Sequence, residues 1–253
     1  MDPARHRDES TIAALSGLAA QHHRATGRGV VVTVAMGATL SVLALLGACA
    51  SSTSGSAATS APTTASAGNV VCKYAPDGQA AKAVNPPAAV EPNAGAATAT
   101  IELSGAASGP VTVDLDRSTA PCTVGSFTHL AQSGYFDGSP CHRLTASVTL
   151  HVLQCGDPSG TGRGGPGYTF ADETDPEMTY PAGTLAMANA GPDTNGSQFF
   201  LVYEDSTLPP KYTVFGTVTG GLDVVTRIAA QGTTSGDDGA PVQPVTISSV
   251  TIS

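Results

Sequence analysis

The chain has 253 residues, a length that allows one folded domain with tails or two small domains. Only 12% of the residues are charged and 5% are aromatic, while 29 are glycine and 18 are proline. This composition favours strands and turns, and it excludes a coiled coil or a helical bundle. The formal net charge is −9, so the basic surface of a nucleic-acid-binding protein is missing and nucleic acid is not an expected partner.

Residues 1–48 are predicted to be an export signal of the lipoprotein type. An apolar run at 30–48 follows a segment that contains four arginines: Arg5, Arg7, Arg24 and Arg28. The run ends in the sequence Leu-Gly-Ala-Cys, which resembles a bacterial lipobox and makes Cys49 the predicted lipidation site. The alternative is an uncleaved membrane anchor, because about 20 apolar residues can span a bilayer. Either reading places the remainder on the extracytoplasmic face of the cell membrane.

Residues 49–97 are predicted to be a tether and a pre-domain segment. The stretch 50–68 is rich in Ser, Thr, Ala and Pro, and it cannot bury enough apolar surface to offset the entropy of ordering. From 69 to 97 the chain gains Cys72 and Tyr74, so part of this stretch is expected to pack on the domain that follows. The folded domain is predicted to span 98–253.

Four cysteines remain besides Cys49: Cys72, Cys122, Cys141 and Cys155. An even number in an oxidising compartment suggests two disulfides, with three possible connectivities. The alternative is a metal site made of Cys141, His142, His151 and Cys155, but this spacing matches no common zinc pattern and no metal is expected.

From residue 98 onward the pattern predicts short, half-buried strands, because apolar and polar residues alternate between Gly, Pro, Asn and Asp. The strands are predicted at 111–115, 149–154, 184–187, 198–203, 212–218 and 245–252. Two stretches have helical spacing instead: one begins at Pro121 and ends before Gly134, and the other covers 222–229. A closed barrel is the expected architecture, since closure removes exposed strand edges.

Arg143 is the strongest candidate for chemistry among the few cations of the domain. It lies between predicted strands and follows His142, so alternation turns one of the two side chains inward or into a cleft. The glycine-rich stretch 160–167 lacks the Lys-Ser ending of a phosphate loop. It is interpreted as a turn in which the glycines, having no side chains, keep the backbone close to the surface of the protein.

Several motifs, read in order, resemble those of cyclophilin-type peptidyl-prolyl cis/trans isomerases. Two of them are the His142-Arg143 pair and the Asn-Gly-Ser-Gln-Phe-Phe sequence at 195–200. The full series occupies 120–127, 134–138, 142–143, 154–158, 160–162, 187–192, 195–200 and 212–216. The resemblance covers essentially all of 98–253.

The resemblance implies a mainly β fold: an eight-stranded closed antiparallel barrel capped by two α-helices, with an outer groove for extended proline-containing peptides. It implies no cofactor. Arg143 is then the catalytic arginine and Gln154 its partner across the groove. The implied substrate-binding residues are His142, His151, Val152, Ala188, Asn189, Ala190, Gln198, Phe200, Leu208 and Tyr212.

Departures from the family pattern shape three further expectations. About three extra residues before Gln154 predict a longer hairpin tip at 145–149. The pair His151-Val152 replaces the usual Phe-Met pair, which predicts a smaller and more polar proline pocket. If Arg143 and Gln154 face each other on adjacent strands, a Cys141–Cys155 disulfide follows from this alignment, and Cys72 then pairs with Cys122.

The predicted function is therefore isomerisation of X-Pro bonds in exported proteins, which aids their folding. The predicted protein is a monomer held at the membrane by its lipid. A guanidinium suits this reaction because it remains charged and can donate to the prolyl nitrogen when the bond twists. The alternative is a non-catalytic, membrane-tethered binding module for proline-containing peptides.

Overall fold

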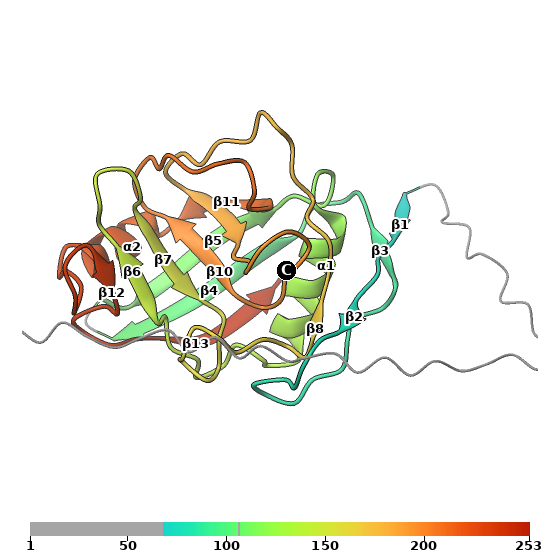
Figure 1. Ribbon diagram of the computed structural model, residues 1–253, viewed down its shortest axis with the longest axis horizontal. Helices are drawn as coiled ribbons and strands as arrows, with labels where there is room; N and C mark the ends of the chain where they lie inside the picture. The colour runs from blue at the N-terminus through green and yellow to red at the C-terminus, as the bar shows by residue number, and fades with distance from the viewer. Residues whose placement is uncertain (1–67, 106) are drawn as a thin grey trace, which may run out of the picture. The chain divides into compact units, whose positions relative to one another are not determined.

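The computed structural model describes residues 68–105 and 107–253 (Figure 1). The predicted export signal, Cys49 and most of the predicted tether lie outside the described residues. Within the described part, the chain forms two helices and thirteen strands. Neither of those two helices has the length and apolar character needed to cross a membrane.

Nine strands form one strongly curled antiparallel sheet, in the order β12-β6-β7-β10-β9-β11-β5-β4-β13 (Figure 1). Their bounds along the chain are β4 Thr98–Gly105, β5 Gly109–Leu115, β6 Arg143–Thr145, β7 Val152–Cys155, β9 Thr184–Met187, β10 Phe199–Val202, β11 Val214–Gly220, β12 Asp238–Gly239 and β13 Val245–Ile252. All six predicted strands are therefore present. The periodicity did not predict the eight-residue β4 or the shorter β6 and β12.

Both predicted helices are confirmed as α1 (Pro121–Gln132) and α2 (Leu222–Ala229). Pro121 occupies the first turn of α1, where its missing N–H costs no helical hydrogen bond. No side chain of the preceding residue caps this helix. Instead, the carboxylate of Glu173 accepts hydrogen bonds from the backbone N–H groups of Cys122 and Thr123, at 3.0 and 2.8 Å. The negative charge of this carboxylate also interacts favourably with the positive end of the helix dipole.

The expected closed eight-stranded barrel is wrong, because the sheet has nine strands and its two ends do not join in a continuous ladder. The outer edge of β6 pairs with β12 rather than with β13. The free side of β13 meets the segment that precedes β6, where Cys141 N–H donates to the Val245 carbonyl at 2.9 Å. Pro140 forms only an isolated bridge with Thr246, since proline has no N–H to extend a ladder.

The core fills the inside of the curled sheet, and β10 shows how the sequence divides its two faces. All four residues of β10 are buried. Phe199 and Leu201 belong to the main core, whereas Phe200 and Val202 belong to a smaller apolar cluster. Alternation along a strand sends these pairs to opposite faces. The outer face of β7, β9 and β10 therefore carries its own apolar cluster.

Residues 69–97 contain three short strands: β1 (Asn69–Val71), β2 (Ala75–Pro76) and β3 (Val90–Pro92). β1 pairs with β3, and β2 pairs with β8 (Tyr168–Thr169). A disulfide joins Cys72 to Cys122 in α1, with the two Cα atoms 5.5 Å apart. This part of the chain is thus attached to the domain by both a covalent bond and a strand pair.

Candidate active site

The outer face of the sheet places Arg143 opposite Gln154. The two residues are direct partners in the antiparallel register of β6 and β7. On the other side of β7, Gln154 is the partner of Phe200 in β10. Side chains that are directly opposite in neighbouring strands point to the same face, so the three side chains form one row.

A chain of hydrogen bonds fixes the polar side chains of this row. Arg143 Nη1 donates to Gln154 Oε1 at 3.2 Å. Gln154 Nε2 then donates to Gln198 Oε1 at 2.9 Å. Gln198 Nε2 in turn donates to the Gly164 carbonyl at 2.9 Å. The orientation of the guanidinium is therefore coupled to the glycine-rich loop.

Asp238 holds the opposite side of the same guanidinium. Arg143 Nε donates to Asp238 Oδ1 at 2.8 Å and Nη2 donates to Oδ2 at 2.6 Å. This two-point pairing leaves N–H groups of the guanidinium free for a ligand, because arginine carries five of them. Hydrogen bonding to Asp238 raises the pKa of Arg143, and the hydrogen bonds from Arg143 lower the pKa of Asp238. Arg143 is thus a fixed, permanently charged donor whose side chain is 39% exposed.

An apolar hollow of about 190 Å³ opens beside the guanidinium. Its walls include Phe200, Val152, Leu208, Tyr212 and Leu150. The rings of Phe200 and Tyr212 meet edge to face, with centroids 5.7 Å apart. The hollow is therefore an apolar recess with a cationic donor at its rim.

A second hollow, of about 580 Å³, adjoins the first and shares Gln154, Ala188 and Asn189 with it. Ala190 and Gln198 line this second hollow as well. The side-chain amide of Asn189 is held within the protein, because its Nδ2 donates a hydrogen bond to the Lys211 carbonyl at 2.8 Å. The two hollows together form one continuous groove along the outer face.

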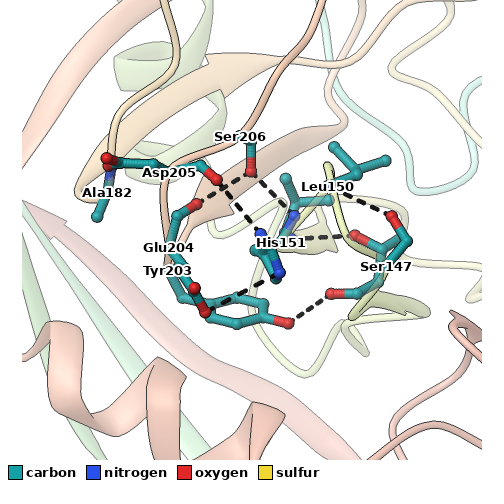
Figure 2. A network of polar contacts seen from close by, with 10 residues as sticks. Ser147, Leu150, His151, Ala182, Tyr203, Glu204, Asp205 and Ser206 are labelled. Carbon is teal, nitrogen blue, oxygen red and sulfur yellow. Dashed lines mark hydrogen bonds and ion pairs between the residues drawn. The ribbon is translucent and has the colours of Figure 1, made fainter.

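The structure does not bring His151 to this groove. Its ring lies against Tyr203, and Nδ1 is 3.3 Å from the Asp205 carbonyl oxygen (Figure 2). The cause is alternation along the chain that leads into β7: Leu150 and Val152 line the apolar hollow, and the residue between them faces the other way. The polar contribution expected from His151 is therefore absent. Leu150 takes its place, and counting back from Gln154 in steps of two would have found it.

His142 also lies outside both hollows. Its ring is partly buried beside Gly162, and neither ring nitrogen has a hydrogen-bond partner among the described residues. Burial lowers its pKa, although the nearby charge of Asp157 opposes that shift. His142 therefore packs behind the loop, while its neighbour Arg143 faces the groove.

A disulfide joins Cys141 to Cys155, with the Cα atoms 4.0 Å apart, and both cysteines are buried. Cys155 directly follows Gln154, so the covalent bond lies behind the paired side chains of the site. The same bond removes two ligands of the metal site considered from the sequence. No group of three or more potential metal ligands occurs in the part of the chain that the structure describes.

The chain that forms this groove is similar to known proteins in sequence and in structure. Residues 98–252 match the family model described as cyclophilin type peptidyl-prolyl cis-trans isomerase. A probable peptidyl-prolyl cis-trans isomerase B of Mycobacterium leprae is 49% identical over 196 residues, which cover 72% of this chain and 66% of the relative. A protein of the same name from Mycobacterium tuberculosis is 54% identical over 156 residues, covering 56% and 51%. The chain thus spans between half and two thirds of the length of these relatives.

Solved structures give the same result for the fold. The crystal structure of a Cryptosporidium parvum cyclophilin type peptidyl-prolyl cis-trans isomerase matches with a TM-score of 0.55 and 30% identity, covering 63% of this chain and 98% of that chain. The structure of that protein in the presence of the dipeptide Ala-Pro matches with a TM-score of 0.54 and 30% identity, covering 62% and 98%.

Proposed function

Because the chain belongs to the cyclophilin-type peptidyl-prolyl cis-trans isomerase family, we propose that it catalyses cis/trans isomerisation of X-Pro bonds in peptide segments. One observation carries this proposal: the Arg143 guanidinium, held by Gln154 and Asp238, lies at the rim of an apolar hollow of about 190 Å³. A recess of this chemistry suits a proline ring, and the guanidinium suits the nitrogen of that ring.

The reaction requires no nucleophile. Partial double-bond character imposes a rotational barrier of about 18–20 kcal/mol on a peptide bond. When an X-Pro bond twists, the prolyl nitrogen becomes pyramidal and gains a lone pair. Arg143 donates a hydrogen bond to that lone pair, an interaction that the planar ground state does not offer. Catalysis follows from this difference in binding.

The other residues position the substrate. Phe200, Leu208 and Val152 hold the proline ring in the apolar hollow, while the preceding carbonyl group rotates. The extended chain of the substrate runs along Ala188, Asn189 and the second hollow. The similar Cryptosporidium structure was determined in the presence of the dipeptide Ala-Pro, which supports a proline-containing ligand here.

The proposed location is the extracytoplasmic face of the cell membrane. The supporting observation is in the sequence, where the apolar run at 30–48 ends in a lipobox-like motif before Cys49. A monomeric protein tethered there by lipid would act on exported proteins as they fold. We expect the mass spectrum of the wild-type protein to show a mature chain that begins at an acylated Cys49. An uncleaved wild-type N-terminus that retains residues 30–48 would instead show a membrane anchor.

The activity is tested by NMR exchange spectroscopy of an Ala-Pro peptide with the full-length chain in detergent. We expect the protein to accelerate exchange, and Arg143→Ala to reduce that rate at least about tenfold, because one lost transition-state donor typically has an effect of this size or more. The control is Arg227→Ala, since Arg227 pairs with Asp223 on the surface of α2. Binding of the peptide without acceleration would refute the enzyme and indicate a binding module.

A further inference from the structure

One wall of the second hollow comes from outside the cyclophilin domain. Asp77, Gly78 and Gln79 line this hollow of about 580 Å³, whereas the family match begins at residue 98. The hollow shares three residues with the apolar hollow. A peptide that places its proline beside Arg143 and extends along these shared residues therefore enters a hollow that the segment 77–79 helps to line.

Backbone hydrogen bonds hold this segment against the glycine-rich loop. Asp77 N–H donates to the Gly167 carbonyl at 3.0 Å, and Ala81 N–H donates to the Gly165 carbonyl at 2.8 Å. The pairing of β2 with β8 lies just before these contacts. The segment 77–79 is thus fixed on both of its sides.

The glycines of the loop make this close approach possible. A Cβ atom at Gly167 would lie 3.0 Å from the Ala80 nitrogen, and one at Gly164 would lie 2.9 Å from the Ala81 Cβ. A side chain at Gly167 would push residue 80 away from the loop, whereas one at Gly164 would meet the Asp157 carboxylate as well as Ala81. The absence of side chains at these two positions therefore allows the pre-domain segment to lie close to the loop.

Further anchors lie at the start of the segment. Cys72 is bonded to Cys122, and the Tyr74 hydroxyl donates to the Cys122 carbonyl at 2.8 Å. The Tyr74 ring meets Tyr168 and Phe170 edge to face, each at 5.6 Å between centroids. A wall attached in this way is a permanent part of the groove.

We propose that residues 77–79 form part of the peptide-binding surface, and that Asp77 selects for a basic side chain close to the substrate proline. This inference rests on the proposed function. Asp77 is exposed, so its carboxylate is free to meet a bound peptide. Arg163 is the other charged residue that lines the hollow among the described residues. Reversing the charge at 77 should therefore change which peptides bind, while the machinery around Arg143 remains intact.

The test uses the full-length chain and a panel of proline-containing peptides. Each peptide carries Lys or Glu at one position, and the positions tested are the two before the proline and the two after it. Exchange rates and dissociation constants are measured by NMR for wild type and Asp77→Lys. We expect the Lys-to-Glu preference at one of these positions to fall roughly fivefold in the variant, a size expected for a charge contact near the surface. The amide signals of Gly78 and Gln79 should also shift when the peptide binds.

Glu102→Lys is the control, because it makes the same charge change on β4, and Glu102 does not line either hollow. An unchanged preference in Asp77→Lys, or an equal change in Glu102→Lys, overturns the inference. The dissociation constants separate the two proposals. If the protein does not catalyse exchange but the binding preference still shifts, the proposed isomerase activity is refuted and the proposed role of residues 77–79 in peptide binding is supported. If no peptide binds, both proposals are refuted.

Discussion

Removal of the Cys141–Cys155 disulfide tests how much this bond, which lies behind the site, contributes to the free energy of unfolding. The two cysteines are 14 positions apart, so the bond closes a loop of about 15 residues. Chain-entropy reasoning assigns about 3 kcal/mol of stability to a loop of that length. For a domain of this size, that loss corresponds to a fall in Tm of about 6–12 °C. We therefore expect Cys141→Ala/Cys155→Ala to remain folded but to be clearly less stable.

The Cys72–Cys122 disulfide serves as the internal comparison. Its separation is 50 positions, and the same reasoning gives about 4 kcal/mol for the longer loop. Urea unfolding followed by circular dichroism measures both double variants under the same conditions. The longer loop should show the larger loss, by about 1 kcal/mol. A loss below about 1 kcal/mol for Cys141→Ala/Cys155→Ala, or the reverse ranking, would refute the argument from loop length.

Three other changes test separate parts of the structure. Glu173→Ala should lower the free energy of unfolding by about 2 kcal/mol, since it removes both a helix cap and a favourable charge at the start of α1. Urea titration measures this loss, and an unchanged unfolding midpoint would contradict the prediction. Asp238→Ala should reduce kcat roughly tenfold with little change in KM, because Arg143 loses the partner that orients it; Asp223→Ala is the control, and equal kcat values argue against the assigned role. His142 has a lowered pKa in the folded protein, so the unfolded chain binds the proton more readily. Stability should fall as the pH drops below about 6.5, and His142→Gln should flatten this fall between pH 7 and 5 in urea titrations; equal slopes would refute the assignment.

The sequence was sufficient for the elements whose pattern is local. Alternation identified strands such as 184–187 and 245–252, and Pro121 marked the start of α1. The resemblance placed Arg143 and Gln154 on facing strands, as the register of β6 and β7 has them. These features depend on neighbouring residues or on an ordered series of motifs, and both are readable from one chain.

Features that depend on distant contacts were not predictable in this way. The sheet remains open because Pro140 cannot extend a ladder and because β12 occupies the edge of β6. No local pattern indicates that residues 238–239 reach that edge. Asp238 was missed as a partner of Arg143 for the same reason, since 95 positions separate the two residues. The position of residues 77–79 beside the groove likewise depends on backbone contacts with a loop far along the chain.

The open sheet has a consequence for behaviour at high protein concentration. An unpaired strand edge can recruit a strand from another molecule and begin aggregation. Here the terminal strand β12 is two residues long, too short to serve as an effective template. At the other end, β13 exchanges backbone hydrogen bonds with residues 138–141 along part of its outer side. Within the described residues, one end of the sheet is therefore short and the first part of β13 at the other end is covered, which leaves less free edge for intermolecular strand addition although the barrel is not closed.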